Sequence, residues 1–115
     1  MDGPEADAQT QVRLGRPTIV VVKSASCGWC RELERTTLRD VRVIRALNGR
    51  TIQVQLDADD PDQATVLEAL RIKGLPTIAV VAADGRVVST HAGYLEAEPF
   101  FRMMGSVING SKKRR

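Results

Sequence analysis

Two cysteines three positions apart are the residues of this chain best suited to covalent chemistry. Cys27 and Cys30 are the only cysteines among the 115 residues, and Gly28 and Trp29 separate them. A disulfide that closes so short a loop restrains the unfolded chain very little. The pair therefore points to redox chemistry, and a purely structural disulfide is the alternative.

The residues around the pair predict how the two sulfurs differ. Thr18–Val22 is a β-branched run typical of a buried strand, and a helix is expected from Trp29 onward. Cys27 then lies at the helix start, where free N–H groups and the helix dipole stabilise the reactive thiolate. We expect Cys27 to be the exposed nucleophile and Cys30 to resolve the mixed disulfide. Gly28 is expected to let the backbone turn closely between the sulfurs, and Trp29 to offer a substrate an apolar surface.

An acidic residue on the same helix is a candidate for proton transfer. Glu34 follows Cys30 by four positions, so both lie on one helical face. Its carboxylate can accept the proton of Cys30 and so set when that thiol attacks; an ordinary solvated charge is the alternative. Lys23, four positions before Cys27, is interpreted as a solvated lysine, with stabilisation of the Cys27 thiolate as the alternative.

Metal binding is the main chemical alternative for a Cys-x-x-Cys pair. Structural zinc usually takes four Cys or His ligands, and this chain has two cysteines and one histidine, His91. A zinc site within one chain is therefore disfavoured. We expect no metal and no cofactor other than the redox-active disulfide itself.

The composition limits the class of protein. Hydrophobic residues make up 43% and charged residues 27%, the balance of a single globular domain. Of the 17 basic side chains, four form the C-terminal run 112–115, and the remaining 13 nearly balance the 14 acidic ones. A basic nucleic-acid surface is therefore not expected. No apolar run approaches the roughly 20 residues of a membrane-spanning helix.

The ends of the chain differ from its middle. We expect an N-terminal segment over residues 1–15, with a short helix within Glu5–Leu14, a domain over 16–109, and a flexible basic tail over 110–115. The first ten residues lack the hydrophobic stretch of a secretory signal. The sequence therefore predicts a cytoplasmic protein, or a periplasmic one if it is a trimmed mature domain.

Patterns along the middle predict the order β-α-β-α-β-β-α. The helix after the cysteines is expected to break at Thr36-Thr37 and to resume after Asp40, an N-cap. Helical connections predict that the first three strands are parallel, whereas the Asp84-Gly85 turn makes the last pair antiparallel. The fold class is therefore α/β, a mixed sheet with helices on both faces. The remaining expected strands lie at 52–56, 77–82 and 86–90. A helix is expected to begin at Asp60-Pro61, and its apolar face consists of Val66, Leu67 and Leu70. The apolar face of the last helix consists of Ala97, Phe100, Phe101, Met104, Val107 and Ile108.

Together these features resemble the thioredoxin superfamily, and more narrowly the C-terminal thioredoxin-like domain of the thiol:disulfide interchange protein DsbD. The resemblance extends from about Arg16 to Met104 and implies a thioredoxin-like fold. Its motifs are Arg16-Pro17, Cys27-Gly28-Trp29-Cys30-Arg31-Glu32-Leu33-Glu34, Thr37-Leu38, Asp40-Val41, residues 57–60, Gly74-Leu75-Pro76-Thr77, Asp84-Gly85 and Gly93-Tyr94.

The resemblance also implies a substrate groove beside the cysteines. Pro76 would follow a cis peptide bond, with a simple loop proline as the alternative. The backbone of Leu75 would pair with a bound peptide as an added strand. Gly93 would line the same groove, where a side chain would obstruct the approach.

The activity that the resemblance implies is that of a thiol–disulfide oxidoreductase, a monomer that reduces disulfides of proteins or peptides. Its electron donor would be a thioredoxin reductase-like protein or a membrane thiol carrier. The alternative is a non-enzymatic module that holds a peptide in the same groove. Two positions depart from the thioredoxin pattern: Val21 stands where a buried Asp is usual, and Ser26 stands where Trp is common. Rates and redox potential therefore cannot be taken over from thioredoxin.

Overall fold

The computed structural model describes residues 15–113, with side chains described up to Gly105. The helix predicted within Glu5–Leu14 lies outside the described residues, as do the side chains of Val107 and Ile108. Within the described range, no helix is both long enough and apolar enough to cross a membrane.

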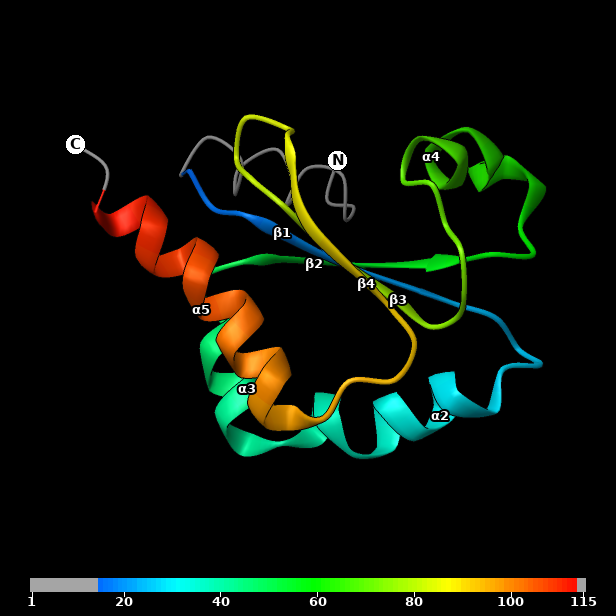
Figure 1. The fold of residues 1–115 in the computed structure, drawn as a ribbon, viewed down its shortest axis with the longest axis horizontal. Helices are drawn as coiled ribbons and strands as arrows, with labels where there is room; N and C mark the ends of the chain where they lie inside the picture. The colour runs from blue at the N-terminus through cyan, green and yellow to red at the C-terminus, as the bar shows by residue number, and fades with distance from the viewer. Residues whose placement is uncertain (1–14, 114–115) are drawn as a thin grey trace, which may run out of the picture.

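Four strands form one mixed sheet in the order β2-β1-β3-β4 (Figure 1). They are β1 (Thr18–Lys23), β2 (Ile52–Asp57), β3 (Thr77–Val81) and β4 (Val87–Ala92). The central strand β1 pairs in parallel with β2 and antiparallel with β3, and β3 pairs antiparallel with β4. The mixed sheet and the final hairpin are therefore confirmed.

The direction of β3 corrects the sequence analysis. β3 was expected to run parallel to the first two strands, but it runs antiparallel to β1. The reason is the length of the connection, because α4 (Ala64–Ala69) has only six residues and spans about 9 Å. A six-residue strand spans about 20 Å, so α4 cannot carry the chain back along the sheet. In Figure 1 it lies near the end of β2, and the chain turns into β3 from there.

The helix after the cysteines is divided as predicted. α2 (Gly28–Arg35) ends before a 3-10 turn, η1 (Thr37–Arg39), and α3 (Val41–Leu47) follows. Asp40 is the N-cap of α3, and its carboxylate accepts a hydrogen bond from the Arg42 backbone N–H at 2.8 Å. The break lets α2 and α3 cover different parts of one sheet face.

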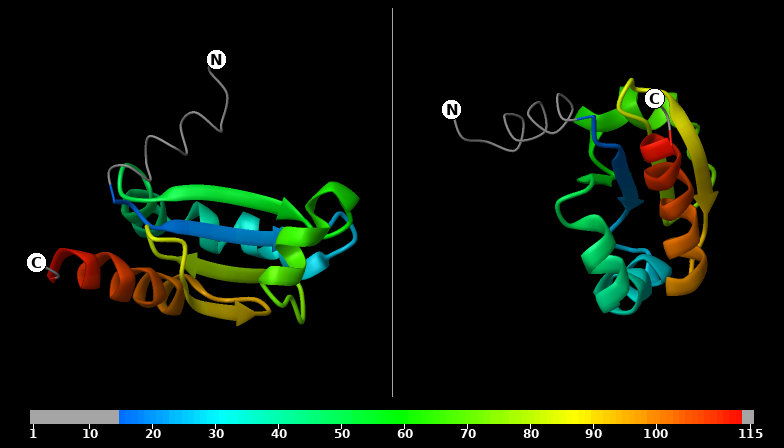
Figure 2. Two further views of the ribbon diagram at one scale, coloured as in Figure 1. Left: turned by 90° about the horizontal axis from the view of Figure 1, so that it is seen from above. Right: turned by 90° about the vertical axis from the view of Figure 1, so that its left-hand side faces the viewer.

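Apolar side chains cover both faces of the sheet. On one face, Leu33 of α2, Val43 of α3 and Phe100 of α5 (Ala97–Lys113) are fully buried against β1 and β3. On the other face, Leu67 and Leu70 of the α4 region pack against a second cluster. Figure 2 shows the sheet between these helices, so the predicted two-sided architecture is confirmed.

Three details of the predicted helices are wrong. Val66 and Phe101 were placed on buried faces, but 49% and 37% of their surfaces are exposed, because each lies at the edge of its apolar stripe. The helix that begins at Asp60-Pro61 starts as a 3-10 turn, η2 (Pro61–Gln63), with the Asp60 carboxylate as its cap. α5 continues to Lys113, past the expected boundary at residue 109. Extending a formed helix adds a hydrogen bond per residue, and this offsets the small cost of one glycine at 110.

Candidate active site

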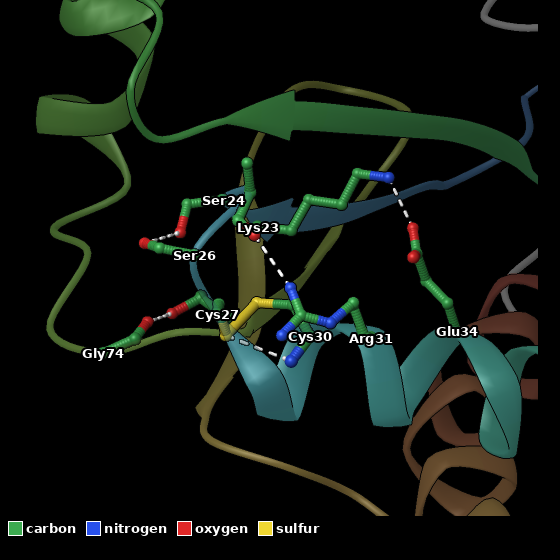
Figure 3. Close-up of a disulfide and its surroundings, with 10 residues drawn as sticks. Lys23, Ser24, Ser26, Cys27, Cys30, Arg31, Glu34 and Gly74 are labelled. Atoms are coloured by element: carbon green, nitrogen blue, oxygen red, sulfur yellow. Dashed lines mark hydrogen bonds and ion pairs between the residues drawn. A yellow bond between two sulfur atoms is a disulfide. The ribbon is translucent and has the colours of Figure 1, made fainter.

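The two cysteines form a disulfide at the N-terminus of α2 (Figure 3). Their Cα atoms lie 5.2 Å apart, and Cys27 is the N-cap residue of the helix. The Cys27 Sγ atom accepts a hydrogen bond from the Cys30 backbone N–H at 3.0 Å. Cys30 is 2% exposed, whereas Cys27 is half-buried. The predicted difference in exposure is confirmed; the roles of attacking and resolving thiol stay predictions.

A short turn carries the chain from β1 to the first cysteine. The Cys27 backbone N–H donates to the Ser24 carbonyl at 3.2 Å, which closes the turn. The Arg31 guanidinium reaches back from α2 and donates to the Ala25 carbonyl at 2.8 Å. This contact of Arg31 was not predicted from the sequence. The available signal was its position, one helical turn after Cys27.

The Leu75-Pro76 loop lies against that turn. Antiparallel pairing sets Thr77 opposite Val22, so the preceding loop residues lie beside the end of β1, and Figure 3 shows Gly74 next to Cys27. The Leu75–Pro76 peptide bond is cis, as the resemblance implied. Pro76 is buried, while the Leu75 backbone makes no hydrogen bond to another described residue. A free strand edge therefore lies beside the disulfide.

The two glycines of the site differ from expectation. Gly28 has no left-handed backbone, and a Cβ atom there would meet open space, so its predicted role in a close turn is wrong. The turn is made by residues 24–27 before it. Gly93 does lie beside the proline, because its N–H donates to the Pro76 carbonyl at 2.6 Å. Its φ of +104° favours glycine, while a Cβ would meet no atom of the chain. Obstruction of a substrate there stays a prediction.

An aromatic pair borders the disulfide. Trp29 is 62% exposed, and its ring lies 5.4 Å from that of Tyr94, at an interplanar angle of 45°. Tyr94 is held by a 2.7 Å hydrogen bond between its Oη and Thr36 Oγ1, and its carbonyl lies 3.2 Å from His91 Nε2. The surface position of Trp29 is confirmed. Tyr94 was not singled out as a site residue, and its place directly after Gly93 was the only sequence signal.

The acid of α2 has a basic partner. Glu34 Oε2 forms an ion pair with Lys23 Nζ, and both side chains are about one third exposed. Figure 3 shows the Glu34 carboxylate turned towards Lys23 rather than towards Cys30. Lys23 is therefore not a free solvated lysine, and it does not point at the sulfurs. Val21, at the position where thioredoxins carry an acid, is 5% exposed and belongs to the apolar core.

The described residues contain no cluster of three or more His, Cys, Asp or Glu side chains that could hold a metal ion. His91 lies on β4 and contacts the Tyr94 carbonyl.

Comparisons with known proteins agree with this geometry. A family model for the thioredoxin-like domain matches residues 4–108. The thiol:disulfide interchange protein DsbD of Yersinia pestis (strain Pestoides F) is 28% identical over 102 residues, which cover 86% of this chain and 17% of that protein. DsbD of Escherichia coli (strain K12) is 29% identical over 89 residues, 75% of this chain and 16% of that protein. The chain thus spans less than a fifth of the length of these relatives.

Solved structures share the fold. A thioredoxin from Thermus thermophilus superposes with a TM-score of 0.76 at 26% identity, covering 90% of this chain and 82% of that one. The reduced C-terminal domain of Neisseria meningitidis DsbD also gives a TM-score of 0.76, at 22% identity, with coverages of 90% and 92%. The fold, the Cys-x-x-Cys disulfide at a helix N-terminus and the cis-proline loop together form a thiol–disulfide exchange centre. Since the family model spans nearly the whole chain, the protein belongs to the thioredoxin-like family.

Proposed function

We propose that this protein reduces disulfide bonds of other proteins. One observation carries the proposal: the sulfur of the half-buried Cys27 lies at a helix N-terminus, is bonded to the sulfur of the buried Cys30, and lies beside an unpaired backbone edge at Leu75. A helix N-terminus stabilises a thiolate, which is the form that attacks a disulfide.

The reaction needs only the two thiols and the substrate disulfide. The Cys27 thiolate attacks one substrate sulfur, forms a mixed disulfide, and releases the other substrate sulfur as a thiolate that takes up a proton. Cys30 then loses its proton and attacks the Cys27 sulfur, which releases the second substrate thiol. Two electrons and two protons have passed to the substrate, and the Cys27–Cys30 disulfide remains. A donor dithiol must reduce that disulfide before the next cycle.

Substrate binding would use the surfaces that surround the disulfide. The Leu75 backbone offers an N–H and a carbonyl to an extended peptide, which would add to the site as a short strand. Trp29 and Tyr94 offer an apolar contact next to the cysteines. Neither backbone pairing nor a non-specific apolar contact requires particular side chains of the substrate. We therefore expect the protein to accept many substrates rather than one.

Glu34 remains a candidate for accepting the Cys30 proton, although its ion pair with Lys23 competes for the carboxylate. With Val21 in the core, the buried acid usual in thioredoxins is absent. We therefore propose that water reaching the helix N-terminus shares the proton transfer with Glu34. The rate at which Cys30 attacks the mixed disulfide should then depend on pH.

The direction, donor and compartment belong to the proposal and depend on the redox potential. A potential of the Cys27–Cys30 pair near about −270 mV indicates a reductase, and one near about −120 mV an oxidant. A reductase would receive electrons from a thioredoxin reductase-like protein or a membrane thiol carrier. We propose that the protein works as a monomer, in the cytoplasm or, as a mature domain, in the periplasm.

The test is catalysed reduction of insulin by dithiothreitol. We expect turnover above the uncatalysed rate for the wild type, none for Cys27→Ser, and a trapped mixed disulfide for Cys30→Ser. Ser26→Ala serves as a control, because it changes the residue next to Cys27 without removing a sulfur. Wild-type protein no faster than background contradicts the proposal. If a variant with both cysteines changed to Ala still captures its partner and still functions, the protein is a peptide-binding module instead.

A further inference from the structure

One hollow of the described surface has none of the active-site residues in its lining. It has a volume of about 400 Å³ and lies between the end of α4, the chain that leads to the proline loop, and strands β3 and β4. Leu70, Val87 and Ala92 give it apolar walls, and Thr90 adds a hydroxyl. Figure 1 shows where α4 and the segment that runs from α4 to β3 lie in the fold. Cavities of this volume are in the range that small ligands occupy.

Two unpaired positive charges border the hollow. Arg71 and Lys73 both line it and both are exposed, and neither side chain forms a hydrogen bond or ion pair with another described residue. Its lining residues include no acidic side chain. Other arginines of the described surface do have acidic partners, as Arg35 has Glu32 and Arg86 has Asp84. The hollow is therefore a positively charged site without an internal counter-ion.

The backbone places Arg71 at the end of α4, on the border of the hollow. Its φ is +54°, which makes it the one residue other than glycine with a left-handed backbone in the described chain. It follows Leu70, the C-cap of α4, and its N–H donates to the Glu68 carbonyl at 3.0 Å. Glycine is the residue that favours this position, because a side chain there is strained. A left-handed residue commonly follows the last turn of a helix, so this backbone conformation is accounted for by the end of α4.

We propose that this hollow binds a small molecule with a doubly charged anionic group, a phosphate ester or a dicarboxylate. The planar guanidinium of Arg71 can hold two oxygens at once, and Lys73 adds a compact charge. Thr90 can donate a further hydrogen bond, while Leu70, Val87 and Ala92 contact the apolar part of the molecule. The site needs no sulfur chemistry, so it does not depend on the proposed reductase activity.

Titration of the ¹⁵N-labelled protein by NMR at low ionic strength tests this proposal. The probes are inorganic phosphate, glycerol 3-phosphate and succinate. We expect saturable shifts confined to the amides of residues 69–73 and of Thr90. Tighter binding of glycerol 3-phosphate identifies a phosphate site, and tighter binding of succinate a dicarboxylate site. Absence of saturable shifts at millimolar concentrations of all three probes overturns the proposal.

A substitution of Arg71 can remove the charge without lowering the stability of the protein. Arg71→Gly removes the guanidinium and relieves the strained backbone, so it should melt no lower than the wild type and bind roughly tenfold more weakly. Arg45→Gln is the matched control, since it removes an exposed charge on α3, on the opposite face of the sheet. If Arg71→Gly is less stable than expected, the affinity of Lys73→Gln for the same probes tests whether the hollow binds anions. Wild-type affinity in both Arg71→Gly and Lys73→Gln, or an equal loss in Arg45→Gln, shows that the hollow is not an anion site.

Discussion

Trp29 allows a quantitative test of the substrate surface. A tryptophan side chain covers up to about 250 Å² of contact area, and with 62% of Trp29 exposed about 155 Å² remains open to a partner. A peptide bound beside Cys27 that covers half of this area would bury about 80 Å². At about 25 cal/mol per Å², the contact contributes about 2 kcal/mol. Trp29→Ala should therefore lower kcat/KM roughly 30-fold.

The assay must separate substrate binding from redox chemistry. We would measure kcat/KM for insulin reduction and, on the same samples, the redox potential of the Cys27–Cys30 pair. The potential should stay unchanged in Trp29→Ala, because no atom of the indole is bonded to either sulfur. Trp29→Phe keeps part of the contact with Tyr94 and should lose less activity. A change in kcat/KM below threefold at unchanged potential would show that Trp29 does not contact the substrate.

Three further outcomes follow from particular contacts. Glu34→Gln should slow release from the mixed disulfide by roughly 100-fold if its carboxylate accepts the proton of the resolving thiol; equal rates in stopped-flow measurements leave Glu34 as an ion-pair partner only. The hydrogen bond from the Arg42 side chain lowers the pKa of Asp40, so the stabilisation is present at neutral pH and is lost as the pH falls through the folded-state pKa. Asp40→Asn should therefore melt below the wild type at pH 7, and the two melting temperatures should converge below about pH 3.9. Phe100→Ala should cost about 3–5 kcal/mol in denaturant unfolding, because the ring is fully buried, whereas Phe101→Ala, which is 37% exposed, should cost clearly less.

Local sequence patterns predicted much of the fold and the position of the two cysteines at the centre of the active site. The β-branched run at 18–22 predicted β1, and Asp40 predicted the start of α3 within one residue. The two cysteines could be placed at a helix N-terminus because strand, turn and helix follow one another directly in the chain. Such features depend on residues a few positions apart, so their physical causes can be read from the sequence. The cis bond before Pro76 came from the family resemblance, not from any local pattern.

The tertiary structure decided the features that join distant parts of the chain. The antiparallel direction of β3 depends on α4 being too short to return along the sheet, and strand patterns alone carry no direction. The contact of Tyr94 with Thr36 joins residues 58 positions apart, and the ion pair of Lys23 with Glu34 joins a strand to a helix. The sequence determined which chemistry this chain carries, because that resides in residue types and short spacings. Only the tertiary packing decided which side chains surround the sulfurs. Each of these contacts joins residues from different elements, and the sheet determines where those elements lie.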